Sequence, residues 1–280
     1  MRSIILHYHL FKNAGTSVDA ILKRNFPGQW LTAGFDGMEN RTAVADWICS
    51  HPQAVAFSLH PAQFPLPEIA DVRIVPIVFL RHPLDRIRSA YAFEKDQPSD
   101  SYGAKLAKQT DLSGYVRTRL DRSQDRQCRN FQTFRLARAV PGPEIADLNR
   151  AVTALQRLPF VGIVESFEQS MARLESLLQP SFPGFKSFAA RKNVTTAPDL
   201  SLDDRLSNLR AEIGGELFEE LLDANLKDIC LHHAASTRLA EVVRSGRAHP
   251  ELQVVESVIP AGASPSAGSR IIAPYLGGSL

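Results

Sequence analysis

Residues 7 to 17 read His7-Tyr8-His9-Leu10-Phe11-Lys12-Asn13-Ala14-Gly15-Thr16-Ser17, between an apolar run and a segment with helical spacing of apolar residues. This order predicts a strand, a tight turn and then a helix. The first N–H groups of a helix have no intrahelical acceptor, and the helix dipole adds partial positive charge there. Lys12 adds a full charge, and two hydroxyls follow it. The stretch therefore predicts a site for a phosphate or sulfate group.

Short apolar runs alternate with helical patterns along the rest of the chain. Strands are expected at residues 3–9, 53–59, 73–80 and 160–164, and helices at 16–24, 38–49, 84–95, 144–158, 165–178, 201–209 and 215–243. Residues 29–37 look irregular, and Pro76 predicts an edge position or a bulge in the third strand. The alternation predicts an α/β fold with a largely parallel sheet covered on both faces.

The composition is that of an ordinary globular protein, with 44% apolar and 22% charged residues in a chain of 280. We expect one domain over residues 1–245, followed at 246–280 by a Gly/Ala/Ser/Pro-rich tail that is flexible or docked as an arm. A net charge of +2 gives no indication of nucleic-acid binding. The three cysteines are scattered, no signal peptide is recognisable, and no apolar stretch would span a membrane. A cytoplasmic location is therefore expected.

The turn differs from the loop of ATP- and GTP-binding proteins. In their GxxxxGK[ST] pattern the Lys follows the last Gly, whereas Lys12 precedes Gly15. Such proteins also place an Asp after a neighbouring strand to hold Mg²⁺, and here Arg81 takes that place. The pattern favours an anion site without a metal. The alternative for the turn is an ordinary helix N-cap.

Polar residues follow each of the four predicted strands, and they are Lys12, His60, Arg81 and Glu165. Ligands of parallel sheets bind at the carboxyl ends of the strands, so these residues are expected to converge on one rim. Ser89 falls about two helical turns after Arg81, where both would contact a phosphate. The alternative is a solvated basic helix face with Asp85 and Arg86 as surface charges.

The turn at Lys12–Ser17, followed by Arg81-His82-Pro83 and by Arg86, Ser89 and Tyr91, resembles the PAPS-dependent sulfotransferase superfamily (PAPS is 3′-phosphoadenosine 5′-phosphosulfate). It is most similar to the branch of heparan-sulfate 2-O- and other carbohydrate sulfotransferases. Segments 130–133, 161–167 and 225–231 are also similar, so the resemblance spans roughly residues 1–240. The chain departs from the family's Pro-Lys-Thr-Gly-Gly-Thr, because it has Phe11-Lys12-Asn13-Ala14-Gly15-Thr16.

The resemblance implies a P-loop-like three-layer fold and a transfer of a sulfuryl group from PAPS to a hydroxyl, without a metal. It implies that His60 is the catalytic base and that Arg81 and Ser89 hold the 3′-phosphate. Lys12 would act in catalysis and in binding, and the 5′-phosphosulfate would lie on Lys12, Asn13, Ala14, Gly15, Thr16 and Ser17. Histidine suits the base role, because its ordinary pKa lies near ~6.5. The alternative for His60 is a structural cap of the Pro-rich loop that follows it. His7 and His9 are expected to be structural, although His9 is close enough to the turn to matter.

Three function classes remain open at this point. The first is a sulfotransferase with a hydroxyl acceptor, for which a saccharide is one candidate; the others are a P-loop kinase or phosphotransferase and a non-catalytic polyanion-binding module. The Arg-rich segment 105–138 would either line a groove for an acidic saccharide or, as we prefer, form a solvated amphipathic helix. Arg191 and Lys192 lie in a loop that could close over the nucleotide, as basic loops do elsewhere in the superfamily; the sequence leaves this open. The acceptor and the oligomeric state do not follow from the sequence.

Overall fold

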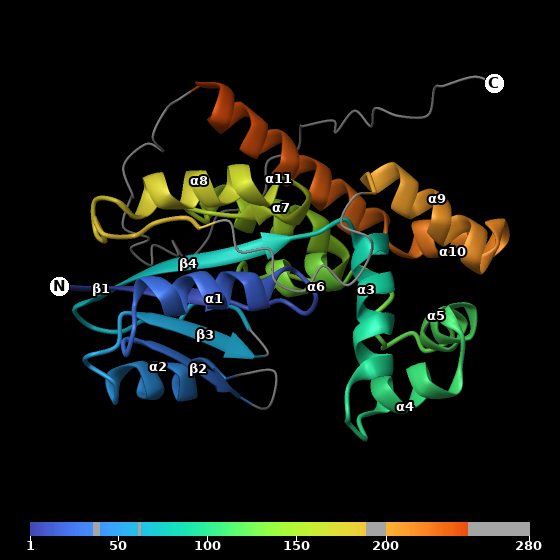
Figure 1. Ribbon diagram of the computed structural model, residues 1–280, viewed down its shortest axis with the longest axis horizontal. Helices are drawn as coiled ribbons and strands as arrows, with labels where there is room; N and C mark the ends of the chain where they lie inside the picture. The colour runs from blue at the N-terminus through green and yellow to red at the C-terminus, as the bar shows by residue number, and fades with distance from the viewer. Residues whose placement is uncertain (36–39, 61–62, 189–199, 246–280) are drawn as a thin grey trace. The chain divides into compact units, whose positions relative to one another are not determined.

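A five-stranded parallel sheet lies at the centre of the computed structural model, which describes residues 1–35, 40–60, 63–188 and 200–245 (Figure 1). The strand order is β2-β3-β1-β4-β5, and all four neighbouring pairs run parallel. The strands are β1 (Arg2–Tyr8), β2 (Trp30–Gly34), β3 (Ala56–His60), β4 (Val72–Leu80) and β5 (Gly162–Ile163). The carboxyl ends of all five therefore face one edge, and the predicted α/β class is confirmed.

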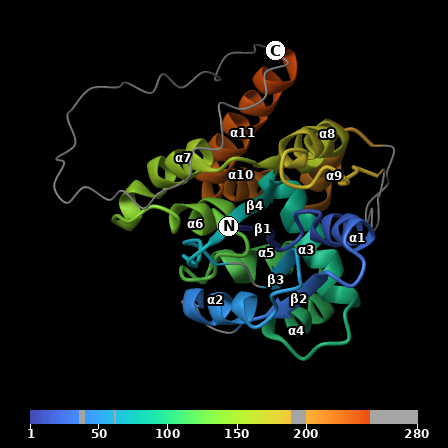
Figure 2. The same ribbon diagram turned by 90° about the vertical axis from the view of Figure 1, so that its left-hand side faces the viewer.

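Strand β1 is apolar on both sides, and its residues Ile4, Ile5 and Leu6 are each fully buried. Helices therefore cover both faces of the sheet. Figure 2 shows α1 (Gly15–Asn25) and α2 (Arg41–Cys49) on opposite sides of the sheet. The core on the α2 side also takes in apolar residues of α6 (Phe131–Ala137), α7 (Asp147–Arg157) and α11 (Leu226–Ser245). Helix α8 (Phe167–Leu178) packs against β5. This arrangement is the expected three-layer fold.

A second apolar cluster lies among helices alone. It joins α3 (Pro83–Asp96), α4 (Tyr102–Gln109), α5 (Leu112–Leu120), α9 (Leu202–Ile213) and α10 (Gly215–Ala224). Two single turns of 3₁₀ helix, Glu144–Ala146 and Val164–Ser166, precede α7 and α8. Helix α3 connects the two parts, since it starts where β4 ends at the sheet edge.

Two predictions about the strands meet different outcomes. Residues 29–37 are not irregular, because Trp30–Gly34 forms β2 and pairs with β3. It is an edge strand without a fully buried residue, so it lacks the apolar run that marks a central strand. Pro76 lies in a part of β4 that β5 does not reach, since β5 pairs only with Phe79 and Leu80. This is the edge-like position expected of a proline in a strand.

The pattern over residues 215–243 corresponds to two helices, α10 and α11, which meet at Asn225. The Asn225 side chain is fully buried and donates to the carbonyl oxygens of Cys128 (2.8 Å) and Leu221 (2.9 Å). Its Oδ1 accepts from the Asn130 amide at 3.0 Å. The long-range bonds to Cys128 and Asn130 explain a break that the apolar periodicity does not reveal.

None of the described helices is long and apolar enough to cross a membrane. Arg191, Lys192 and the tail at 246–280 lie outside the described residues.

Candidate functional site

The turn between β1 and α1 has an unusual backbone. Lys12 (φ 62°) and Ala14 (φ 59°) are both left-handed, a conformation that costs energy for residues other than glycine. Ala14 is the N-cap of α1 and makes no side-chain capping bond, so the turn is not an ordinary side-chain N-cap. Alternating backbone conformations of this kind gather N–H groups into a concave anion site. Observed strain at a helix N-terminus thus supports the expected anion cradle.

Asn13 ties this turn to the neighbouring strand. Its Nδ2 donates to the Phe79 carbonyl at 2.7 Å and to Gln132 Oε1 at 2.8 Å, and the residue is 2% exposed. Gln132 Oε1 also accepts from the Arg81 amide (2.9 Å), and its Nε2 donates to the Arg81 carbonyl (2.8 Å). The Asn13 side chain therefore supports the turn, and it is not available to a bound phosphate.

A buried carboxylate holds the backbone of Gln132 in place. Asp228 is fully buried and accepts from the amides of Gln132 (3.0 Å) and Thr133 (2.7 Å) at the start of α6. A carboxylate at this place satisfies the first N–H groups of the helix and complements its dipole. The hydrogen-bonded chain from Asp228 through Gln132 to Asn13 thus fixes the turn against β4.

Arg81 lies beside Lys12, as the strand order predicts. Its Nη1 donates to the Lys12 carbonyl at 3.2 Å, and its Nη2 pairs with Asp85 at 2.8 Å. Asp85 is 2% exposed at its side chain and also pairs with Arg205 of α9 at 3.0 Å. Two guanidinium groups and one carboxylate leave a net positive charge, which Lys12 increases.

Lys12 directs its Nζ over the ring of Phe93, 4.4 Å from the centroid. Burial and, to a smaller extent, the charge of Arg81 lower the pKa of Lys12 below its ordinary value. Because burial and a nearby like charge destabilise the protonated form of Lys12, a bound anion would stabilise this side chain strongly.

Helix α3 buries the residues that would have been surface charges. Asp85 is 3% exposed and Arg86 is fully buried, so the alternative of a solvated basic face is wrong for both. Arg86 stacks on Phe131 (4.5 Å to the centroid) and donates to the Gln127 carbonyl. Ser89 is 1% exposed, and its Oγ has no hydrogen-bond partner among the described residues. A buried hydroxyl without a partner costs stability, which is typical of a position kept for a ligand.

In the Arg-rich segment 105–138, one arginine departs from the expected solvated face because it is buried. Arg119 is 6% exposed and pairs with Glu94 (2.9 Å) and Asp125 (2.8 Å). Arg126 pairs with Glu144, and Arg129 donates to the Leu120 carbonyl at 2.9 Å. Arg119 is thus a buried structural residue, whereas the Arg126 pair is exposed, and Arg117 and Arg122 are exposed as a solvated face requires.

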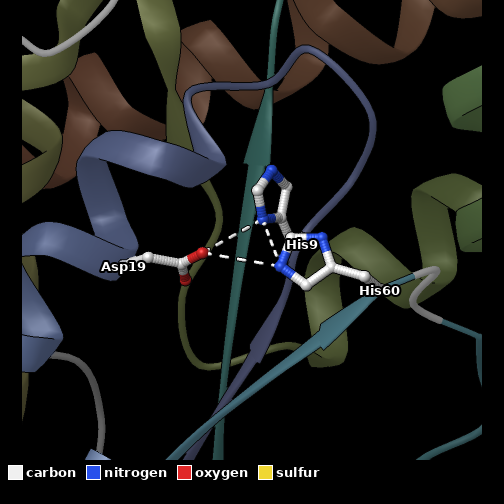
Figure 3. Close-up of side chains that lie close together, drawn as sticks. All are labelled: His9, Asp19 and His60. Carbon is white, nitrogen blue, oxygen red and sulfur yellow. Dashed lines mark hydrogen bonds and ion pairs between the residues drawn. The ribbon is translucent and has the colours of Figure 1, made fainter. Parts of the chain in front are cut away.

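His60 stands at the end of β3 in a cluster with two side chains from other elements (Figure 3). Its Nε2 lies 2.9 Å from Nδ1 of His9 and 3.5 Å from Oδ2 of Asp19. Nδ1 of His9 is 3.2 Å from the same Asp19 oxygen. The His60 side chain is 43% exposed, and its contacts with His9 and Asp19 are made through Nε2, not Nδ1. The cluster thus presents one ring nitrogen to the outside.

Asp19 is the centre of this cluster. Its Oδ1 accepts from Ser58 Oγ at 2.6 Å and lies 2.8 Å from His7 Nδ1. Burial would raise the pKa of Asp19, but hydrogen bonds from His60, His7 and His9 outweigh it and hold the pKa far below its ordinary value. Burial lowers the pKa of His9 to about 4, so this imidazole is neutral at pH 7.

The histidine cluster and the anion cradle are in direct contact at Gly15. A β-carbon on this residue would overlap the imidazole ring of His9, so only glycine fits there. Since His9 touches His60, the two predicted parts of the site form one continuous surface at the sheet edge.

Glu165 lies at the other end of the same rim. Its Oε1 accepts from the His82 amide at 2.8 Å, and its Oε2 lies 3.0 Å from His232 Nε2. The rings of His82 and His232 pack edge to face, and burial, followed by the charge of His232, lowers the pKa of His82 to about 4. Glu165 therefore joins the start of α3 to His232 within α11.

The sequence gives no indication that Asp19 and Gln132 belong to the site, and it favours a structural role for His9 despite its place next to the turn. Asp19 lies one helical turn after Gly15, and His9 Nδ1 lies 2.9 Å from His60 Nε2, so His9 is part of the His60 cluster. Gln132 lies more than 50 residues from both groups that it joins. For His9 a signal was available, because one histidine directly follows β1 and another ends β3, and these strands are neighbours in the sheet.

Comparison with known proteins finds an archaeal relative of this chain. No known protein-family profile matches it. Over 240 residues it is 40% identical to a protein of Archaeoglobus fulgidus that is described as an uncharacterized protein. The match covers 82% of this chain and 94% of the archaeal protein, so it includes nearly all of that protein's length. The chain belongs to the same family as this archaeal protein.

Proposed function

We propose that the protein is a sulfotransferase that moves a sulfuryl group from PAPS to a hydroxyl of an acceptor, for which a saccharide is one candidate. The observation that carries this proposal is the contact between the His60 cluster and the Lys12–Ser17 turn. A general base beside an anion cradle is what transfer to a hydroxyl requires.

In the proposed complex the turn amides, Lys12, Thr16 and Ser17 surround the 5′-phosphosulfate. Their charge stabilises the negative charge that grows on the leaving phosphate and on the sulfuryl oxygens. The buried Ser89 hydroxyl and Arg81 hold the 3′-phosphate, which distinguishes PAPS from ATP. The carboxylate of Asp85 aligns Arg81 for this contact.

The proposed base is Nδ1 of His60. Its Nε2 carries a proton and faces His9 and Asp19, which leaves the lone pair on Nδ1 for the acceptor. The hydroxyl proton passes to Nδ1 as the acceptor oxygen bonds to sulfur. The bond between sulfur and the bridging oxygen breaks, and adenosine 3′,5′-bisphosphate (PAP) leaves with the electron pair.

The test compares His60→Ala with His51→Ala. His51 is exposed and precedes β3, so it lies at the opposite end of the strand from His60. Transfer from labelled PAPS to a panel of hydroxyl acceptors should fall by about 10²–10⁴-fold in His60→Ala and stay unchanged in His51→Ala. PAP should raise the melting temperature of both variants as it does for the wild type.

Three outcomes of this test would contradict the proposal. Unchanged turnover in His60→Ala would show that His60 is not the base. Loss of PAP binding in that variant would show that His60 is a binding residue. Stabilisation of the wild type by MgATP and not by PAP would favour a phosphotransferase.

A further inference from the structure

We propose that His9 Nδ1, His60 Nε2 and Asp19 Oδ2 form a binding site for one divalent transition-metal ion of the Zn²⁺ class. The three atoms come from β3, from α1 and from the residue that follows β1, and they point toward one another (Figure 3). Two histidines and one carboxylate are a common ligand set for such ions, with further positions left open.

The distances between the three atoms fit an ion at their centre. They are 2.9 Å between the two nitrogens, 3.2 Å from His9 to Asp19 and 3.5 Å from His60 to Asp19. With bonds of about 2.1 Å to a shared ion, these separations correspond to ligand angles of roughly 90–110°. Such angles lie between octahedral and tetrahedral geometry. The existing side-chain positions would therefore accept the ion with little movement.

The chemistry of the three side chains also suits a cation. A carboxylate oxygen and two imidazole nitrogens with free lone pairs are the ligand forms that such ions bind. Ser58 Oγ (2.6 Å) and His7 Nδ1 (2.8 Å) hold the other Asp19 oxygen, as outer-shell partners orient a metal-binding carboxylate. The exposed edge of His60 leaves room for water or another ligand.

Binding at this site has a consequence for catalysis, and this part rests on the proposed function. A neutral imidazole that gives its Nε2 lone pair to a metal carries its proton on Nδ1. His60 then has no lone pair for the acceptor hydroxyl, so the ion would inhibit transfer reversibly. The metal site thus regulates the base and is not a part of the transfer step.

The binding experiment uses the full-length protein after treatment with a chelator. Co²⁺ is added while its visible absorption is followed, and Zn²⁺ is then titrated in competition. We expect one ion per chain in the wild type and in His51→Gln, in which an exposed histidine outside the cluster is replaced. His9→Gln and His60→Gln should bind at least ~100-fold more weakly, since even outer-shell partners contribute 10–100-fold. The His60→Gln variant should fold normally because the His60 side chain is 43% exposed, so weaker binding by this variant would not result from misfolding.

The outcomes separate this site from the proposed function. Weak binding by the wild type, or an affinity in His9→Gln and His60→Gln equal to that of the wild type, overturns the metal site even if transfer is observed. One tightly bound Co²⁺ that depends on both histidines supports the site even if no acceptor is ever found. Where transfer is measurable, Zn²⁺ should inhibit it and a chelator should restore it; full activity with the site occupied would overturn the inhibitory role.

Discussion

Replacement of Gln132 by leucine tests whether one buried amide holds the two halves of the anion site together. Gln132 is 1% exposed and makes three short hydrogen bonds, one with Asn13 of the turn and two with the backbone of Arg81. Leucine has a similar size and none of the polar groups. The substitution therefore removes the link between the turn and the end of β4 without leaving a large cavity.

The expected loss follows from the groups left without partners. The amide and carbonyl of Arg81 lose their side-chain partner, whereas Asn13 Nδ2 retains the Phe79 carbonyl at 2.7 Å. A buried polar group without a partner costs about 1–3 kcal/mol. Because Arg81 is partly open to solvent, we expect a total loss of about 2–4 kcal/mol in the free energy of unfolding. Most domains of this kind would remain folded after such a loss.

Urea unfolding of Gln132→Leu and of the control Gln156→Leu measures this loss. Gln156 is exposed on α7, so its replacement should change the free energy of unfolding by less than about 0.5 kcal/mol. In the same samples, the affinity for PAP should fall at least about tenfold in Gln132→Leu, because the turn and Arg81 lose their fixed spacing. A stability loss no larger than that of the control would refute the reasoning. Unchanged PAP affinity in a destabilised protein would refute the positioning role.

The remaining predictions concern acid stability, the buried hydroxyl and the close contact at the turn. Between pH 6.5 and 4 the unfolded chain binds more protons than the folded one, because burial lowers the pKa of His9 to about 4; the free energy of unfolding should fall by about 3 kcal/mol over this range, and His82 acts in the same direction. Urea titrations at several pH values measure this slope, which should be smaller in His9→Gln. Ser89→Ala should leave the free energy of unfolding equal or slightly higher, because the Ser89 Oγ has no partner among the described residues, but it should weaken PAP binding about tenfold. Urea unfolding and calorimetry on one preparation measure both quantities; a lower stability with unchanged PAP affinity would contradict this prediction. Gly15→Ala should lower the melting temperature and abolish transfer, since its new methyl group would overlap His9; Gly184→Ala, which meets nothing within 4 Å, is the control.

The predictable part of the site follows from strand ends. Apolar runs located four of the five strands, and parallel pairing brings their carboxyl ends together whatever the side chains are. This is why Lys12 and Arg81 could be expected to meet, and they do, through the Lys12 carbonyl. β2 escaped prediction because an edge strand needs no continuous apolar run.

The amino-acid sequence by itself determined the parallel sheet, the turn after the first strand and the residues that follow each strand. Only the tertiary structure decided that Asp19 faces two histidines and that Gln132 joins the turn to Arg81. The physical reason is the range of the forces involved. Backbone pairing and apolar periodicity act over a few residues and repeat, so they are visible in the sequence. The hydrogen bonds of a buried side chain depend on how helices from distant segments rotate and pack, and no local pattern records that.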